Sequence, residues 1–392
     1  MSTLNFRDAS AILNALHKQV TGRENIVPAN TADFVSVANA TIANGFDPVM
    51  NAISQMIGRT VFSSRVYSAK LGALQVDNMA FGNHVRKITM THQPSEPDQR
   101  YSAAAITDGQ SVDMYSVRKP GVVQTNFYGG TTRQRHYTVY RDQLNTAFSS
   151  PEEFGHFMSL LTTENANIIE QELETLRRGT ILNYIGGKQK ADSSNVFHLL
   201  TEYNAVTGQE LDAKTVKLPE NYPAFVAWAM SRIKTVSDMM TERTTMFHQT
   251  IGEQSILRHT PMDCQRLYIY APQMNEMETR VFSNTYHTEY LDKLGAFERV
   301  NFWQSIKSPD CVEVCPSYMD ENGEQKTETQ PIKISNVFGV LADREAMGCT
   351  VFDQWSSSTP INSAGGYWNI YHHWTERFWN DHTENGCIFL LN

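Results

Sequence analysis

The chain has 392 residues, 41% of them hydrophobic, so it is long enough to bury a substantial core in one large domain or two ordinary ones. No apolar run reaches the length of about eighteen residues that a membrane-spanning helix needs. The formal net charge of −9 argues against a protein whose main function is to bind nucleic acid, because neutralising phosphates requires a basic surface.

Neither secretion nor a disulfide framework is predicted. The first residues lack the apolar stretch of a secretory signal. The cysteines are sparse and odd in number, a pattern typical of a chain that folds in a reducing cytoplasm. They are Cys264, Cys311, Cys315, Cys349 and Cys387.

Residues 1–63 predict two short amphipathic helices joined by a loose tether. Apolar residues at helical spacing fill 5–21, and residues 24–32 have the composition of a loop. A second helix is predicted over 47–58, where a proline follows the opening aspartate and a glycine closes the segment. Helices of this kind suit an arm that lies against another surface.

Residues 64–126 predict a long two-stranded hairpin. Strand-like runs occur between 61 and 76 and over Val85–Met90, and Asp113–Val117 and Val122–Asn126 would return antiparallel to them. A two-stranded hairpin is only marginally stable in water by itself, so it needs a surface to lie on. That surface is either a neighbouring subunit or the hairpin's own domain, and the sequence leaves both open.

A basic, aromatic block with strand composition, residues 127–140, leads into a predicted helix over 150–178. Ser150 supplies an N-cap hydroxyl and Glu153 a capping-box carboxylate. Gly179 follows two arginines and suits the left-handed C-cap conformation. About 28 residues at 1.5 Å each make a rod of roughly 42 Å. The rod carries no catalytic constellation and is predicted to be a structural girder.

The rest of the chain interleaves helices and strands without the regular βαβ rhythm of a doubly wound enzyme, which predicts an α+β fold. Helices are predicted over 222–247 and 275–294. Strand-like runs and one surface hairpin are predicted at 267–270, 310–331, 335–341, 348–353 and 366–374.

No catalytic or cofactor motif is complete. Gly186-Gly187-Lys188 resembles part of a phosphate-binding loop, but Leu182 stands where that loop needs glycine and Gln189 where it needs Ser or Thr. No enzyme activity and no cofactor are therefore predicted.

The densest set of potential metal ligands lies near the C-terminal end. Neighbouring residues of a strand point to opposite faces, so His372 and His373 cannot both serve one ion, and no metal site is predicted. The whole set is His372, His373, Glu376, His382 and Cys387.

Arginines interleaved with aromatic residues around 127–141 are reminiscent of a nucleic-acid surface. The alternatives are a solvated strand or intersubunit ion pairs, which the acidic net charge favours. We treat these residues, with the arginine pair near the end of the long helix, as candidate intersubunit contacts. They are Phe127, Tyr128, Arg133, Arg135, Arg141, Arg177 and Arg178.

Three stretches, in the same order along the chain, resemble one protein family. The run 127–140, with a helix that ends near Tyr184, is similar to the spine-helix region of the major capsid proteins of small podophages, the phi-29-like group. Residues 268–302 resemble that group's strand, helix and short loop, and 366–374 resemble its closing aromatic strand.

The resemblance implies the HK-97-type capsid fold and a division of the chain into five segments. In that fold the arm and the loop would reach across neighbouring subunits. The segments are an N-terminal arm (1–63), an extended loop (64–126), a peripheral domain with the spine helix (127–200), an axial domain (201–345) and the peripheral return strands (346–392).

The function implied by the resemblance is that of a major capsid protein, which self-assembles into the icosahedral or prolate head shell around the double-stranded DNA of a tailed bacteriophage. Its partners would be further copies in pentamers and hexamers, a portal protein and a separate scaffolding protein, because the N-terminal stretch is too short for a built-in scaffold. No membrane and no sequence-specific DNA contact are implied. The expected location is the virion capsid, assembled in the host cytoplasm.

Two alternatives stay open at this point. The first is an HK-97-type shell of a cellular nanocompartment, which would enclose a protein cargo. The second is a cytosolic hydrolase whose site lacks a recognisable motif, which would need a concave pocket and would form a monomer or small oligomer.

Overall fold

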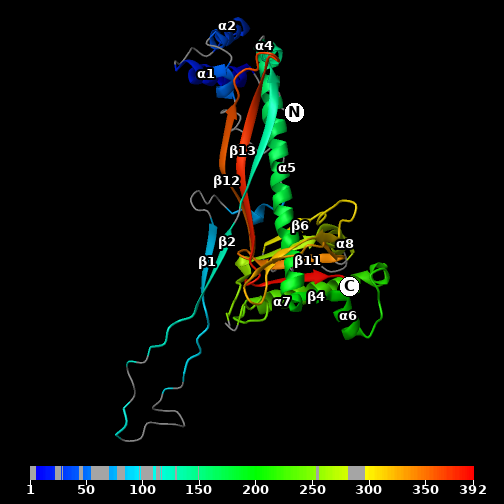
Figure 1. Cartoon of the computed structure of the whole chain (residues 1–392). Coiled ribbons are helices and arrows are strands. Elements are labelled where there is room, and N and C mark those ends of the chain that lie inside the picture. The colour runs from blue at the N-terminus through cyan, green and yellow to red at the C-terminus, as the bar shows by residue number, and fades with distance from the viewer. Residues whose placement is uncertain are drawn as a thin grey trace. The chain divides into compact units, whose positions relative to one another are not determined.

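The computed structural model describes residues 6–22, 28, 30–43, 47–53, 70–76, 84–96, 98, 109–111, 115, 117–128, 130–148, 150–252, 256–280 and 296–392. Figure 1 shows the chain with its elements labelled. The chain divides into two compact units, each described here by itself. Unit 1 comprises Met1–Phe81, Gly130–Arg177 and Cys349–Arg377, and unit 2 comprises Gly82–Gly129, Arg178–Gly348 and Phe378–Asn392.

The unit 1 sheet has the strand order β12-β13-β3, formed by Met347–Ser358, Tyr367–Asn380 and Thr131–Tyr140. β13 and β3 are antiparallel, with Tyr367 opposite Tyr140 and Glu376 opposite Thr131. Side chains of β13 alternate between buried and half-buried along the strand. One face of the sheet therefore packs on the unit 1 core, and the other is open.

Helices from the start of the chain complete the unit 1 core. They are α1 (Phe6–Thr21), α2 (Thr31–Ile42) and the helical residues 47–53. The short helix α4 (Arg141–Ala147) belongs to the same core. Their apolar side chains pack with Phe154 of the long helix and with Trp368 of β13. The Trp368 indole donates to Asp47 Oδ1 at 2.6 Å. The surface that these predicted arm helices lie against is thus their own unit.

The prediction of a loop over 24–32 is wrong for residues 31 and 32, because α2 begins at Thr31. The side chain of Asn30 caps this helix by accepting a hydrogen bond from the backbone N–H of Asp33 at 2.9 Å. The prediction of a helix within 5–21 is confirmed.

The long helix α5 runs from Pro151 to Ala191, 41 residues in all. Its predicted start is confirmed, since Ser150 Oγ accepts from the backbone N–H of Glu153 at 3.2 Å. Its predicted end at residue 178 is wrong, because Gly179 lies inside the helix. A helical glycine costs only about 1 kcal/mol, and the burial of Ile181 and Ile185 beyond it outweighs that cost.

The main sheet of unit 2 has the strand order β4-β14-β11-β5-β6. The central strand β11 is buried along its whole length, as the sequence predicted. Helices α6 (Leu199–Thr207), α7 (Tyr222–Met240) and α8 (Ala271–Arg280) belong to unit 2, and apolar side chains of all three share its core. The strands are Val196–His198, Gly386–Leu390, Val337–Asp343, Gln265–Tyr270 and Ala296–Val300.

The predicted helix over 222–247 ends at Met240, and the first part of the predicted helix over 275–294 lies in α8. Residues 281–295 and the strand-like runs at 61–67 lie outside the described residues. The predicted hairpin over 310–331 occurs as two nested antiparallel ladders that close at the turn after Asp320. They pair β7 (Val312–Val314) with β10 (Ile332–Ile334), and β8 (Ser317–Met319) with β9 (Gln325–Thr327).

A further antiparallel pair in unit 2 joins β1 (His84–Met90) to β2 (Val122–Tyr128), side by side in Figure 1. This pair lies at the predicted position of the hairpin strands. In its register, Met90 faces Val122 and Lys87 faces Thr125. Because directly opposite residues share a face, the register assigns every described side chain of the pair to one of two faces.

Candidate intersubunit surfaces

One face of the β1–β2 pair points away from the rest of unit 2 and is rich in apolar side chains. We call it the outer face. Exposed fractions are 56% for Ile88, 63% for Met90, 54% for Val122 and 72% for Tyr128. Single exposed apolar residues are ordinary, but a group on one face marks an interaction surface. The described side chains of the outer face are Arg86, Ile88, Met90, Val122, Gln124, Asn126 and Tyr128.

The opposite, inner face of the same pair carries Lys87, Thr89, Val123, Thr125 and Phe127, and charged groups of unit 2 hold it through Lys87 and Thr89. Lys87 Nζ lies 3.0 Å from Asp381 Oδ2 and also contacts Glu384 Oε1. Arg258 Nη1 reaches the same Glu384 oxygen at 3.0 Å, and its Nη2 donates to Thr89 Oγ1 at 3.1 Å. Strand β1 is therefore tied to unit 2 by ion pairs and hydrogen bonds.

The pKa values of these charged groups follow from burial and from one another. Burial opposes the charge of Lys87, but Asp381 and Glu384 more than compensate and raise its pKa above the ordinary value. Burial also opposes the charge of Asp381, yet Lys87 and the hydrogen bonds from Thr383 hold its pKa below the ordinary value. For Glu384 burial prevails over Lys87 and Arg258, and the pKa is raised.

Two predicted contact residues lie in this strand pair. Tyr128 is on the outer face, whereas Phe127 is on the inner face and half-buried. Sequence reasoning missed the remaining outer-face residues. The alternation of apolar and polar residues in β1 and in β2 was a signal for them, but it does not tell which of the two faces is covered.

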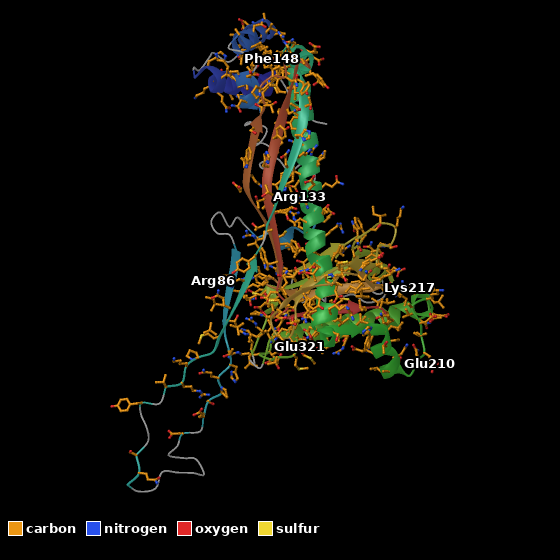
Figure 2. The ribbon with its side chains drawn as sticks, viewed as in Figure 1. Arg86, Arg133, Phe148, Glu210, Lys217 and Glu321 are labelled. Carbon is orange, nitrogen blue, oxygen red and sulfur yellow. The ribbon has the colours of Figure 1, made fainter. Side chains whose placement is uncertain are left out.

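The arginines of β3 lie on the same side of the unit 1 sheet as the buried residues of β13, and the Arg133 side chain is 57% exposed there. Arg133 and Arg135 lie opposite the buried Trp374 and His372 of β13. Arg133 Nε donates to Glu376 Oε1 at 2.6 Å. Figure 2 labels Arg133 on β3 and Arg86 on β1.

Arg135 is half-buried beside His372, and this environment changes the imidazole. Burial, together with the positive charge of Arg135, lowers the pKa of His372 to about 4. Asn165 Nδ2 lies 2.8 Å from His372 Nε2, so the ring is neutral and hydrogen-bonded at neutral pH.

The open face of the same sheet carries polar and aromatic side chains from all three strands. Gln134, His136, Thr138 and Tyr140 of β3 are exposed there, on the opposite side of the strand from its arginines. The rings of His136 and Tyr371 stack with 5.3 Å between centroids, and those of Trp355 and His373 with 3.9 Å. A face of this kind does not supply the cations that phosphate groups need.

The remaining three arginines have different environments. Arg141, the first residue of α4, is exposed. Arg177 is buried, donates to the Lys70 carbonyl oxygen at 3.2 Å and also contacts Gln75 Oε1. Arg178 donates to the Phe302 carbonyl oxygen and lies 3.9 Å from the centroid of that ring. Arg177 is thus used inside unit 1, where it holds the segment 70–75 against α5.

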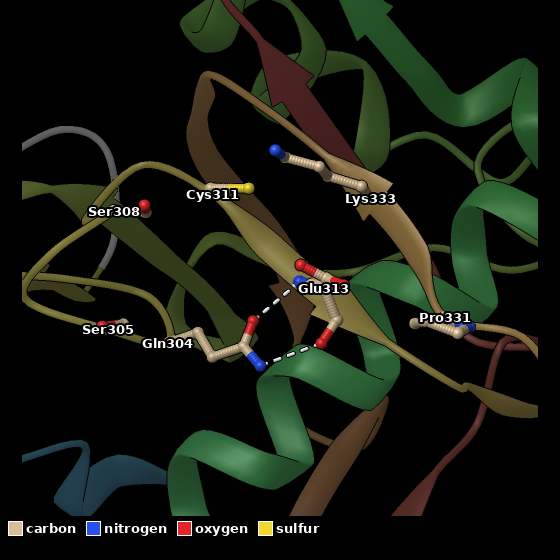
Figure 3. Close-up of a pocket in the computed structure, with 7 residues that line it drawn as sticks. All are labelled: Gln304, Ser305, Ser308, Cys311, Glu313, Pro331 and Lys333. Atoms are coloured by element: carbon tan, nitrogen blue, oxygen red, sulfur yellow. Dashed lines mark hydrogen bonds between the residues drawn. The ribbon is translucent and has the colours of Figure 1, made fainter.

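A cavity of about 400 Å³ lies beside the edge of β7 and is shown in Figure 3. The Gln304 side chain donates to the Glu313 carbonyl oxygen at 2.9 Å and accepts from the Glu313 N–H at 2.7 Å. These bonds occupy the outer edge of β7. The lining contains no histidine, so it does not form the Ser–His or Cys–His pair of a hydrolase. The lining residues are Gln304, Ser305, Ser308, Cys311, Glu313, Pro331 and Lys333.

The residues considered as metal ligands do not converge. Among the described residues, no group of three His, Cys, Asp or Glu side chains is placed to hold a metal ion. His382 stacks on Tyr184 of α5, and burial lowers its pKa to about 4. Within the same described part of the chain, no helix is long and apolar enough to cross a membrane.

Comparisons with known proteins agree with a structural function. A family model described as Phi29-like phage major capsid protein matches residues 10–390. No curated protein matches the chain by sequence.

Solved structures match over most of the chain. One is the capsid structure of Staphylococcus phage Andhra, with a TM-score of 0.54 and 9% identity over 84% of this chain and 86% of that chain. Another is the structure of the head fiber and inner core protein gp22 of native bacteriophage P68, with a TM-score of 0.51 and 8% identity over 84% and 87%. At these identities the similarity concerns the fold, and it confirms the expected HK-97-type capsid fold.

Proposed function

The chain belongs to the Phi29-like phage major capsid protein family, and from this premise we propose that the outer face of its β1–β2 pair joins neighbouring copies in the head shell. The protein is a major capsid protein of the virion, and copies of it form a homo-oligomeric shell. This membership favours a phage capsid over a nanocompartment shell or a hydrolase.

The observation that carries the proposal is the exposure of Ile88, Met90 and Val122 together on one face. Exposure of apolar side chains to water is unfavourable, and burying each of these half-exposed side chains would gain about 1 kcal/mol. A gain of that size is modest for a single contact. In a closed shell the same contact repeats around every ring of subunits, so weak interfaces sum to a stable assembly.

We assign unit 1 to the peripheral domain and the main sheet of unit 2, with its helices, to the axial domain. The first assignment is supported by the long helix α5 beginning in unit 1 and by the sheet of β3, β12 and β13. The predicted division placed 178–200 and 346–392 with the peripheral domain, whereas contacts group residues 178–348 and 378–392 in unit 2. The extended loop corresponds to the segment that includes β1 and β2.

Further partners follow from the family rather than from any contact in this chain. We propose that pentamers and hexamers of this protein assemble with a separate scaffolding protein and a portal protein, and enclose double-stranded DNA without reading its sequence. The net charge of −9 supports the last point. So do the half-buried position of Arg135 and the ion pair that Arg133 forms with Glu376.

The test compares an Ile88→Asp/Val122→Asp double variant with the wild type in cells that produce all head proteins of the phage. The control is Val206→Asp in α6, a site that is 72% exposed and lies outside the outer face. Sedimentation and electron microscopy should show closed shells for the wild type and for the control, and unassembled subunits with unchanged circular dichroism for the double variant. Normal shells from the double variant would refute the assignment of this surface.

A further inference from the structure

The inner face of the β1–β2 pair is attached to unit 2 by a closed network of charges. Lys87 of β1 contacts Asp381 and Glu384, which lie in the turn between β13 and β14. Glu345, from the turn between β11 and β12, lies 3.8 Å from Lys87 at the rim. Arg258 completes the network through Glu384.

This network is enclosed within unit 2. Side-chain exposure is 20% for Lys87, 15% for Arg258, 8% for Glu384 and 1% for Asp381. Charges removed from water are stable only while their partners stay in place, because an unpaired buried charge is strongly unfavourable. Loss of one partner would therefore leave the other charges of the network buried and unpaired, and would weaken the attachment of β1.

Hydrogen bonds fix the geometry of the network from its other side. Thr383 donates to Asp381 Oδ1 from its N–H at 2.9 Å and from its hydroxyl at 2.6 Å. Arg258 Nε donates to the Thr383 carbonyl oxygen at 3.1 Å. These hydrogen bonds hold the turn that receives Lys87, so the turn determines where β1 is attached.

We propose that Lys87, Arg258, Asp381 and Glu384 form a latch that fixes the direction in which the β1–β2 pair leaves unit 2. The latch therefore sets where the outer face is presented to a second copy of the chain. This inference rests on the proposed function, and it adds positioning residues that do not themselves touch the neighbour. Opening the latch frees the strand pair without altering the outer face.

The test measures amide hydrogen exchange in β1 and β2 of the full-length, unassembled chain. Lys87→Met removes the cation and leaves Asp381 and Glu384 buried without it, so exchange over residues 84–90 and 122–128 should rise about tenfold or more. Amides of the buried strand β11 serve as the internal control. Lys87→Arg keeps the charge and should restore most of the protection.

A milder variant covers the case in which Lys87→Met does not fold. Thr89→Val removes only the hydroxyl that accepts from Arg258 Nη2, and should raise exchange in the strand pair about threefold. Shell formation should fall with the rise in exchange in both variants and recover in Lys87→Arg.

Two results would overturn the latch. One is unchanged exchange of β1 and β2 in variants that fold. The other is faster exchange accompanied by normal shells, which would show that the direction of the strand pair does not matter for assembly. Failure of the proposed function is a separate result, namely normal shells from the Ile88→Asp/Val122→Asp variant, which leaves the exchange measurement unaffected.

Discussion

A methyl group on Gly187 would lie 2.6 Å from both Cε1 and Nε2 of His382. The imidazole cannot easily move away, because it is buried and stacks on Tyr184, 5.1 Å away between centroids and nearly parallel to it. This close approach explains a glycine inside the last turns of α5. It also shows that the helix continues past Gly179 in order to pack within unit 2.

Replacing Gly187 by alanine should therefore destabilise the protein, although alanine is the better helix former. We expect a loss of about 1–3 kcal/mol in the free energy of unfolding, from the forced shift of the buried ring. Gly179→Ala is the matched control, since nothing lies within 4 Å of the added methyl group. That variant should gain about 0.5–1 kcal/mol. Urea unfolding monitors both, and equal effects of the same sign would refute the packing argument.

The buried histidines should make the fold sensitive to acid. Burial lowers the pKa values of His372 in unit 1 and His382 in unit 2 to about 4, from an ordinary value of 6.5. The unfolded chain binds these protons first as the pH falls, so stability is intact above about pH 6.5 and declines between 6.5 and 4. Each histidine contributes roughly 3 kcal/mol to this decline.

The pH dependence can be assigned by substitution at His382. His382→Gln should be less stable at neutral pH but should show a flatter dependence of unfolding free energy on pH between 7 and 4. Urea unfolding at a series of pH values measures both. A slope identical to that of the wild type would show that His382 does not remain neutral in the fold.

Local signals predicted the elements that local contacts determine. The Ser150 cap marked the start of α5, and the continuous apolar run 337–341 marked a buried central strand. The end of α5 could not be predicted, because the sequence shows Gly179 as an ordinary stop and the packing of Ile181 and Ile185 only appears in three dimensions. The start of α2 was predictable in principle from Asn30 and Asp33, which form its cap.

The candidate surfaces were predicted less well, for one physical reason. A strand's period of two tells which residues share a face, but only the packing tells which face is covered. Arg133 and Arg135 share a face with the buried side of β13, and Phe127 shares one with Lys87. Ile88 and Met90 lie in a segment that was predicted as a hairpin, but the sequence did not indicate which face of that hairpin is exposed.

The cysteines should differ sharply in reactivity. Burial raises the pKa of the Cys349 thiol to about 11 and that of Cys387 to about 12, whereas Cys315 is exposed. At pH 8 iodoacetamide should therefore modify Cys315 in the folded chain, and should reach Cys349 and Cys387 only after denaturation. Peptide mass spectrometry identifies the modified residues. Cys315→Ser is the control, and rapid native modification of Cys387 would contradict the buried position of β14.

We expect Arg177 to stabilise the folded chain and not to contact a neighbouring subunit. Arg177→Met would deprive the Lys70 carbonyl and the Gln75 side chain of their donor, at a cost of about 2–4 kcal/mol in unfolding free energy. Arg141→Met, at an exposed position, should change stability by less than about 0.5 kcal/mol. Urea unfolding gives both values, and shell yield measured on the folded fraction separates the two functions. A stable Arg177→Met variant that fails to assemble would make Arg177 an intersubunit contact after all, because its loss would then be felt only between copies.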